Sequence, residues 1–389
     1  MDPYKQLDYF ALDDQFSEDE LMVRDAVRSW TSERFLPVIQ EHYEAGTFPM
    51  DLVPELAELG VFGSNLPEEY GCAGMNNVCY GMICRELERG DSGLRSFVSV
   101  QGSLVMWPIF AYGTEDQKRE WLPKLASGEA LGCFGLTEPD YGSNPGGMTT
   151  VAALDGNDYI LNGRKMWITN GTISDVAIVW AKLDGVIRGF VVPCDLPGFS
   201  APEQKHKFSL RASVTSELVL EDVRIPKTAI FPEIKGLRGP LQCLTQARYG
   251  ISWGAVGAAE AVFSEGLSYS KEREVLDKPL AAFQIPQMKL ADMATEITMA
   301  QLLMLRLGRM KDAGTMTSAQ VSMAKRNNVH MALECSRKVR DMLGANGISL
   351  EYGVGRHMCN LESVITYEGT HDIHTLAIGH EVTGIPAYR

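Results

Sequence analysis

The spacing of hydrophobic residues changes twice along the chain, and this change limits the folds that it can adopt. Up to about residue 130, apolar residues recur at helical spacing, beginning after a capping box at Ser17 and Glu20. Residues 131–238 carry short β-branched runs separated by turn dipeptides, which predict antiparallel strands. Helical spacing then returns. We therefore predict an α+β protein with an N-terminal α-helical domain at 1–130, a middle antiparallel β domain at 131–238 and a C-terminal α-helical domain at 239–389.

Asx-Gly dipeptides divide the middle region into strands. Asparagine or aspartate followed by glycine is the strongest short-range hairpin signal, because both residues adopt left-handed backbone conformations at low cost. The dipeptides that predict hairpin turns are Asp155-Gly156, Asn162-Gly163, Asn170-Gly171 and Asp184-Gly185.

The helical regions carry their own signals. Pro108 lies in an apolar stretch at 101–112 and predicts a kinked or broken buried helix. Thr114 and Gln117 form a capping box that predicts the start of the next helix. In the C-terminal unit, small residues share one helix face and predict close approach of a second helix at Gly250, Gly254, Gly257 and Ala261.

Composition narrows the class of partner. The 389 residues are 45% hydrophobic and 22% charged, which is ordinary for a globular protein. The net charge of -14 and the pI near 5.1 argue against nucleic acid or an anionic membrane as the main partner. No run of about 18 apolar residues occurs, so we expect no membrane span. Residues 1–5 carry neither a signal nor a transit pattern, and a cytoplasmic location is the default expectation.

Neither the cysteines nor the histidines predict a metal site. The eight cysteines are scattered without a Cys-x-x-Cys pair, which favours reduced packing thiols over disulfides or a zinc ribbon. His371, His374 and His380 do not all share one helix face, and no His-Glu-x-x-His motif is present. We predict no metal and interpret these histidines as polar helix residues.

Glu368 is the strongest candidate for a reacting group. It lies between Tyr367 and Gly369, ahead of Thr370, which is a good helix N-cap, and Asp372 in the first helical turn. A carboxylate on a loop at the mouth of a helix can act as a general base, with a pKa that burial raises or the helix dipole lowers. The alternative is a solvated glutamate before a helix.

Two segments of the middle region carry a family resemblance. Phe134-Gly135-Leu136-Thr137-Glu138-Pro139 with Gly142-Ser143, and Trp167-Ile168-Thr169-Asn170, are similar to the flavin-contacting segments of the acyl-CoA dehydrogenase family. The chain resembles this family over nearly its whole length, which implies FAD as cofactor and a C-terminal four-helix bundle. An ordinary hairpin turn with a core Trp is the alternative, and Asn144 departs from the family's usual Asp. The resemblance places these residues at the flavin: Phe134, Leu136, Thr137, Gly142, Ser143, Trp167, Ile168 and Thr169.

Further flavin contacts are implied at the other end of the sequence. Residues 341–347, Asp-Met-Leu-Gly-Ala-Asn-Gly, resemble the segment that receives the FAD pyrophosphate or adenine, commonly from a neighbouring subunit. A tight turn after a helix is the alternative. The segment Arg273-Glu274-Val275-Leu276-Asp277 departs from the family's usual Arg-x-x-Phe-Gly by lacking the aromatic ring and adding carboxylates. The residues implied are Arg273, Gln284, Asp341, Leu343, Gly344, Ala345, Thr370 and Asp372.

The substrate site is also implied by resemblance. Residues 243–250 are similar to the segment that lines the acyl-CoA site, although a structural ion pair is an equal alternative for Arg248. Residues 91–101 resemble those of glutaryl-CoA dehydrogenases, where an arginine suits the distal carboxylate of the substrate. A surface arginine at a helix end is the alternative. The expected substrate residues are Glu88, Arg95, Ser96, Ser143, Cys243, Arg248, Tyr249, Tyr367 and Gly369.

The resemblance implies a reaction and partners. Glu368 would remove the α-proton of an acyl-CoA while hydride leaves for the flavin, and glutaryl-CoA would be oxidised and decarboxylated to crotonyl-CoA. Electrons would pass to an electron-transfer flavoprotein, and the protein would be a homotetramer. One alternative is a dehydrogenase of another dicarboxylyl or short-chain thioester without decarboxylation. The other is a catalytically idle, flavin-poor relative that serves as an interaction protein.

Overall fold

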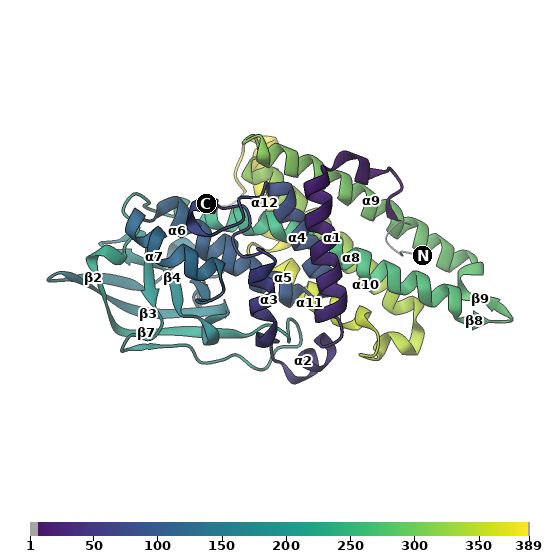
Figure 1. Ribbon diagram of the computed structural model, residues 1–389, viewed down its shortest axis with the longest axis horizontal. Helices are drawn as coiled ribbons and strands as arrows, with labels where there is room; N and C mark the ends of the chain where they lie inside the picture. Colours follow the sequence, from purple (N-terminus) through teal and green to yellow (C-terminus); the bar gives the residue numbers. More distant parts are fainter. Residues whose placement is uncertain (1–6, 388–389) are drawn as a thin grey trace.

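The protein, described by a computed structural model over residues 7–387, has three regions (Figure 1). A sheet forms one end of the molecule, long C-terminal helices form the other, and N-terminal helices lie across both. Residues 1–5, whose composition predicts no targeting segment, lie outside the described range. The α+β architecture predicted from the sequence is confirmed.

The N-terminal helices begin where the local signals predict. Ser17 Oγ accepts from the Glu20 backbone N-H at 3.2 Å, and Glu20 accepts from the Ser17 N-H at 2.9 Å, which completes the capping box of α1. The same arrangement at Thr114 and Gln117 begins α7. The helices are α1 (Glu18–Trp30), α2 (Ile39–Ala45), α3 (Val53–Glu58), α4 (Asn77–Gly90), α5 (Ser92–Ser99), α6 (Trp107–Tyr112) and α7 (Glu115–Ala126).

The predicted break around Pro108 is present, but it lies before the proline. A π-type turn occupies Val100–Met106, and Pro108 stands in the first turn of α6. Proline fits there because the first N-H groups of a helix have no intrahelical acceptor to lose.

The middle sheet is mixed, which corrects the prediction of a purely antiparallel unit. Its strands are β1 (Gly132–Gly135), β2 (Val151–Asp155), β3 (Asp158–Thr169), β4 (Val176–Leu183), β5 (Val186–Pro193), β6 (Phe199–Ser200) and β7 (Thr215–Pro226). The order is β1-β4-β2-β3-β7-β6, with β5 on β4, and both β1 and β2 run parallel to β4. These parallel partners are distant in sequence, as in Gly132 opposite Val176, so turn signals could not report them.

Two of the predicted hairpin turns are correct. Asp155-Gly156 begins the link from β2 to β3. Asp184-Gly185 joins β4 to β5, and its φ values of 50° and 80° are those of a type I′ turn.

The other two hairpin predictions are wrong. Asn162-Gly163 lies inside β3 at a bulge, where a Cβ on Gly163 would come within 2.4 Å of Thr150 Oγ1. The glycine therefore serves close backbone approach and not a turn. Asn170-Gly171 ends β3 with Asn170 at φ 67°, but β3 pairs with β2 and β7 and not with the following β4.

The C-terminal region is helical, as predicted. Gly250, Gly254 and Gly257 of α8 face α4, and a Cβ on Gly257 would lie 1.9 Å from the Arg85 carbonyl oxygen. The predicted close approach of two helices is therefore present. The helices are α8 (Arg238–Glu272), α9 (Gln284–Asp312), α10 (Ser318–Met342), α11 (Gly353–Thr366) and α12 (His371–Thr383).

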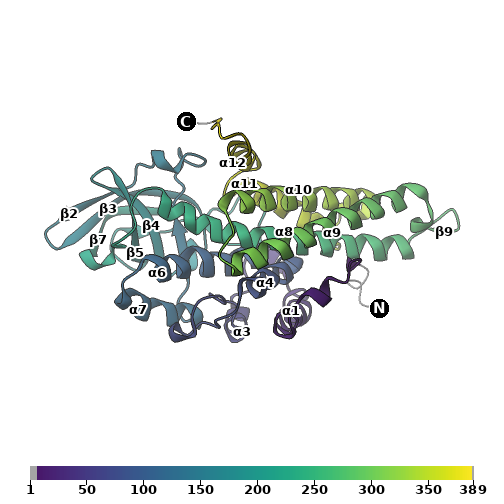
Figure 2. The same cartoon turned by 90° about the horizontal axis from the view of Figure 1, so that it is seen from above.

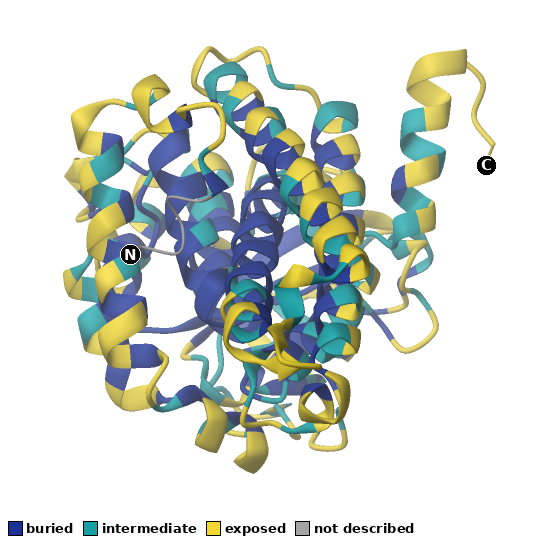
Figure 3. Cartoon of the chain, turned by 90° about the vertical axis from the view of Figure 1, so that its right-hand side faces the viewer, coloured by how far each residue is buried: buried dark blue, intermediate teal, exposed yellow. Residues whose placement is uncertain are grey.

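One feature of this region has no counterpart in the sequence prediction. A hairpin of β8 (Glu274–Val275) and β9 (Lys278–Pro279) follows α8, with Leu276 and Asp277 at φ 50° and 59°. No glycine marks this turn. The helix expected after Thr370 is α12, which lies along one side of α10, where Arg326 Nε donates to Thr375 Oγ1 at 2.7 Å, and which is largely exposed on its other side (Figures 2 and 3).

Buried residues form three clusters, one among the N-terminal helices, one in the C-terminal helices and one in the sheet. All eight cysteines are free, as predicted. Within residues 7–387, no helix combines the length and apolar character needed to cross a membrane.

Candidate active site

Glu368 lies in the short link between α11 and α12. Its φ is 52°, in the left-handed region that side chains rarely adopt, and Gly369 follows at φ 100°. A Cβ on Gly369 would lie 2.9 Å from His374 Nε2, so the close packing also requires glycine there. Thr370 Oγ1 accepts from the Ile373 N-H at 3.2 Å, which confirms the predicted N-cap of α12.

Two cationic side chains hold the carbonyl groups of this link. Arg248 of α8 donates its Nε-H to the Glu368 carbonyl oxygen at 2.5 Å. Lys325 of α10 donates to the carbonyl oxygens of Tyr367 and Gly369, the latter at 2.7 Å. Three successive carbonyls are therefore bound by basic groups from two helices.

The Glu368 carboxylate is incompletely hydrogen-bonded. Its Oε2 has no contact with solvent and no partner among the described residues. Burial raises the pKa of Glu368, and Arg95, Lys325 and Arg248 oppose that rise. Of the two directions that the sequence left open, the structure favours the upward one. A carboxylate with a raised pKa and a free oxygen is suited to accept a proton.

Arg95 on α5 is fully buried, which excludes the alternative of a surface arginine. Its Nε donates to Glu88 Oε2 at 2.6 Å, and its Nη2 donates to the Tyr367 hydroxyl. Within residues 7–387, Arg95 Nη1 and Glu88 Oε1 are buried without a hydrogen-bond partner. The cluster thus offers both an unused donor and an unused acceptor beside the Glu368 link.

Asp91 fixes α5 against α11. It caps α5 by accepting from the Gly93 N-H at 2.6 Å, and its other oxygen accepts from Arg356 at 2.5 Å and Asn360 at 2.7 Å. Arg356 and Asn360 belong to α11, which leads directly into Tyr367 and Glu368. One buried carboxylate therefore fixes the position of α5, which carries Arg95, relative to α11, which leads to Glu368. Sequence reasoning assigned Asp91 no role of its own.

The two predicted flavin segments lie side by side. The Met166 N-H donates to the Thr137 carbonyl at 2.8 Å, which joins the segment after β1 to β3. Trp167 is 63% exposed at φ 62°, and Gly142 and Ser143 are exposed as well. A large exposed indole beside open backbone fits a flat aromatic ring such as a flavin.

The remaining residues of these segments serve packing. Phe134, Leu136 and Ile168 are 8%, 5% and 3% exposed and belong to the hydrophobic clusters. Their side chains point into the core, so any ligand contact falls to their backbone groups. Thr137 and Thr169 are partly buried.

Glu138, inside the first flavin segment, is a structural carboxylate that sequence reasoning did not single out. It accepts five hydrogen bonds, from the N-H and hydroxyl groups of Thr149 and Thr150 and from Lys165 at 2.9 Å. Burial alone would raise the pKa of Glu138, but Lys165 and the hydrogen bonds lower it to about 2. Glu138 thereby fastens both ends of the Gly142-Ser143 loop to the sheet.

The other predicted flavin residues lie at the far end of the molecule. Arg273 and Gln284 flank the β8–β9 hairpin, which Figure 1 shows opposite the sheet. Leu343 is close to them, because its carbonyl accepts from Tyr269 of α8 at 3.4 Å. Asp341, Gly344 and Ala345 are exposed. One chain therefore does not bring these residues to Trp167.

The other predicted residues lie in the core or, in one case, on the surface. Cys243 and Ser96 are in the core, and the Tyr249 hydroxyl donates to the Asn77 carbonyl at 2.8 Å. Asp372 is exposed in the first turn of α12.

His374 differs from its prediction as a polar helix residue. It is 1% exposed, and neither ring nitrogen has a partner within residues 7–387. Burial, Lys325 and Arg248 lower the pKa of His374 to about 2. His374 is therefore neutral beside the Glu368 link. In the same described range, no cluster of three or more His, Cys, Asp or Glu side chains is arranged for a metal.

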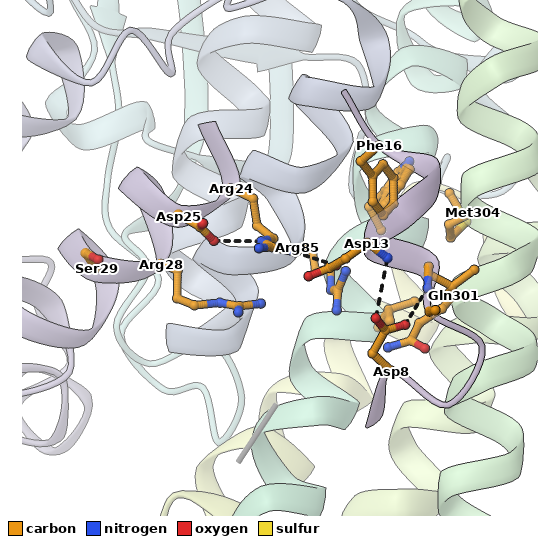
Figure 4. Close-up of a pocket in the computed structure, with 14 residues that line it drawn as sticks. Asp8, Asp13, Phe16, Arg24, Asp25, Arg28, Ser29, Arg85, Gln301 and Met304 are labelled. Atoms are coloured by element: carbon orange, nitrogen blue, oxygen red, sulfur yellow. Dashed lines mark hydrogen bonds and ion pairs between the residues drawn. The ribbon is translucent and has the colours of Figure 1, made fainter. Parts of the chain in front are cut away.

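A cavity of 590 Å³ lies elsewhere, between the N-terminal segment and α1, α4, α8 and α9 (Figure 4). Its arginines are engaged in ion pairs: Arg24 with Asp13 at 2.6 Å, Arg85 with Glu260 at 2.6 Å. None of the predicted site residues lines it. The candidate active site is therefore the Glu368 link and its neighbours.

The chain belongs to the acyl-CoA dehydrogenase family. Models of the family's N-terminal, middle and C-terminal domains match residues 17–129, 133–223 and 235–383.

Individual relatives span nearly the whole chain. A glutaryl-CoA dehydrogenase from Mycobacterium smegmatis, solved with FADH2, is 52% identical with a TM-score of 0.97, covering 100% of this chain and 99% of that one. A probable acyl-CoA dehydrogenase of Bacillus subtilis is 35% identical over 377 residues, 95% of this chain and 99% of the relative. The human mitochondrial short-chain specific acyl-CoA dehydrogenase is 32% identical over 373 residues, 94% of this chain and 90% of the relative.

Proposed function

We propose that the protein oxidises glutaryl-CoA between its α and β carbons and decarboxylates the product to crotonyl-CoA, with Glu368 as the base. FAD is the cofactor, and it supplies the acceptor for the hydride. Trp167, Ser143 and the backbone of residues 134–137 would hold its ring.

The observation that carries the glutaryl assignment is the buried cluster of Arg95, Glu88 and Tyr367. An ordinary acyl chain needs apolar walls, whereas this cluster places an unused N-H of a buried guanidinium beside the Glu368 link. A guanidinium N-H binds a carboxylate well, and a desolvated one discriminates strongly against an apolar group. A substrate with a distal carboxylate satisfies this donor.

Glu368 can serve both proton transfers. Its carboxylate removes the α-proton, and its backbone N-H is the donor proposed for the thioester oxygen, where negative charge develops. After CO2 leaves from the γ-carbon, the protonated Glu368 can return a proton to the dienolate. The raised pKa of Glu368 suits this double role, because it brings the acid and base forms closer in energy near neutral pH.

A second chain would complete the flavin site. The predicted flavin residues form two groups at opposite ends of the chain, with Trp167 at one end and Arg273, Gln284 and residues 341–345 at the other. A single flavin would therefore take one group from each of two chains. We therefore propose a homotetramer in which a neighbouring chain provides the second half. The reduced flavin needs an oxidant, and an electron-transfer flavoprotein is the proposed one. A cytoplasmic location stays a prediction from the sequence.

The test is anaerobic reduction of the flavin by a panel of acyl-CoAs. We expect bleaching near 450 nm to be fastest with glutaryl-CoA, and the product mass after turnover to be that of crotonyl-CoA. Rapid bleaching by butyryl-CoA with none by glutaryl-CoA would favour the short-chain activity that the 32% identical relative carries in its name. Loss of CO2 is not required for the dehydrogenase assignment itself, since a glutaconyl-CoA product, which keeps the carboxylate, would remove only the decarboxylation.

A further inference from the structure

Lys325 is a buried lysine that is hydrogen-bonded to the link that carries Glu368. It lies on α10 and is 1% exposed. Its Nζ donates to the carbonyl oxygens of Tyr367 and Gly369, the residues directly before and after Glu368. A single side chain thus bridges the two peptides that flank Glu368.

The backbone at Glu368 needs such support. A φ of 52° is unfavourable for a residue with a side chain, and such conformations persist only when surrounding contacts hold them. Arg248 binds the Glu368 carbonyl itself, and Thr370 caps α12. Among the described residues 7–387, the hydrogen bonds of Lys325 are the ones that join the carbonyl groups on both sides of Glu368.

The charge of Lys325 also bears on the carboxylate. Burial lowers the pKa of Lys325 to about 7, while the Glu368 carboxylate opposes this shift and Arg248 and Arg95 add to it. The two carbonyl acceptors favour the ammonium form. An ammonium here stabilises ionised Glu368. The charged and titratable groups around the pair come from α4, α5, α8, the link and α12: Glu88, Arg95, Arg248, Tyr367, His371 and His374.

We infer that Lys325 is a positioning residue that holds Glu368 in its left-handed conformation through the carbonyls on either side and aims its carboxylate at the substrate. The inference rests on the proposed role of Glu368 as base. Lys325 does not itself contact the reacting atoms, so its removal should leave substrate binding largely intact.

The test compares Lys325→Met with a control on the same helix, Lys338→Met. Lys338 lies about 20 Å further along α10, at about 1.5 Å per residue, and pairs with Asp292 at 3.8 Å. Hydrogen exchange of the purified holoenzymes should show faster exchange over residues 367–371 in Lys325→Met and no change in Lys338→Met. This readout does not depend on activity.

Kinetics supply the second readout. In Lys325→Met we expect flavin reduction by the best substrate to slow by about 100-fold, with little change in KM, because the base is misplaced. The acid limb of the rate profile should move to higher pH by about one pH unit, since loss of a nearby cation raises the pKa of Glu368. Lys325→Gln keeps an N-H donor group without the charge, and its rate should lie between those of the parent protein and Lys325→Met.

The outcomes separate this inference from the proposed function. If none of the acyl-CoAs reduces the flavin of the unaltered protein, the proposed function fails. Hydrogen exchange then still decides whether Lys325 holds the link. Unchanged exchange over 367–371 in Lys325→Met overturns the inference. Faster exchange with an unchanged rate and pH profile also overturns it, because the link would then be held without consequence for the base. Should Lys325→Met fail to fold, Lys325→Gln decides by the same measurements.

Discussion

Glu138 and Glu368 are carboxylates in two regions of the molecule, each beside a buried lysine, and their hydrogen-bonding surroundings differ. Glu138 receives five hydrogen bonds from Thr149, Thr150 and Lys165. The Glu368 side chain retains an oxygen with no partner within residues 7–387. Lys165 donates directly to the Glu138 carboxylate, whereas Lys325 donates to the backbone carbonyls of Tyr367 and Gly369.

The difference separates the structural role of Glu138 from the chemical role that we propose for Glu368. A fully hydrogen-bonded carboxylate is stabilised in its charged form, and the pKa of Glu138 falls to about 2. Burial raises the pKa of Glu368 because too few donors compensate for the lost water. The first anchors a loop, and the second is free to exchange a proton.

The largest effect is expected from Glu368→Gln. The amide is nearly isosteric but cannot take the proton, so flavin reduction should fall by about 10³-fold while fold and FAD content remain. Rapid-mixing spectroscopy of the holoenzyme measures the rate. Glu362→Gln, at a half-buried residue of α11 paired with Arg337, is the control and should behave as the parent. Retention of more than a few per cent of the rate in Glu368→Gln would exclude Glu368 as the base.

Glu138→Gln should show the opposite pattern. It leaves Lys165 buried without a counter-charge, and breaking such a pair costs about 3–5 kcal/mol in the free energy of unfolding. Urea unfolding provides the measurement. The control, Glu217→Gln, weakens an exposed 3.7 Å pair with Arg164 and should cost less than about 1 kcal/mol. Equal stability of both variants would contradict the structural role of Glu138.

Arg95→Met tests whether the cluster beside Glu368 recognises a carboxylate. We expect kcat/KM for glutaryl-CoA to fall by an amount that corresponds to about 2–5 kcal/mol of lost transition-state binding free energy. The change in kcat/KM for butyryl-CoA should be far smaller. The double variant Arg95→Met/Glu88→Gln removes the carboxylate that the single change leaves buried and unpaired. It should recover stability without recovering glutaryl-CoA activity. Equal losses on the two substrates would make Arg95 structural.

The pH dependence should distinguish the two carboxylates. Because the pKa of Glu368 is raised above its ordinary value of 4.5, the carboxylate is protonated while the falling pH is still above 4.5. The reduction rate should decline in that pH range. The pKa of Glu138 is depressed, so its stabilisation is complete above 4.5 and is lost only as pH falls towards about 2. Activity should therefore disappear at a higher pH than the fold, as followed by kinetics and circular dichroism. Coincident loss would contradict this.

The smallest effect concerns an exposed contact, at Arg273. This arginine is exposed on the β8 side of the hairpin, close in sequence to Glu274 and Asp277 and without the aromatic residue usual in the family. If it binds the FAD diphosphate, high salt should screen the contact and promote FAD release, measured by flavin fluorescence after dilution. Salt-independent retention of FAD would remove Arg273 from this role.

The sequence by itself determined the features that depend on residues a few positions apart. The caps at Ser17, Thr114 and Thr370, the type I′ turn at Asp184-Gly185 and the order of helical and strand regions follow from such local signals. Glu368 could also be singled out, because a carboxylate before a capped helix is a local pattern.

Tertiary structure decided the environment of those residues. The parallel pairing of β1 with β4, the bulge at Gly163 and the Asp91 contacts that align α5 with α11 join positions far apart in sequence. Lys325 lies 43 positions before Glu368 in the sequence, and only folding brings it to the link. Burial and partner count set a pKa, and both are properties of the packed molecule. The sequence therefore singled out the proposed base, and packing determined how its backbone is held and in which direction its pKa is shifted.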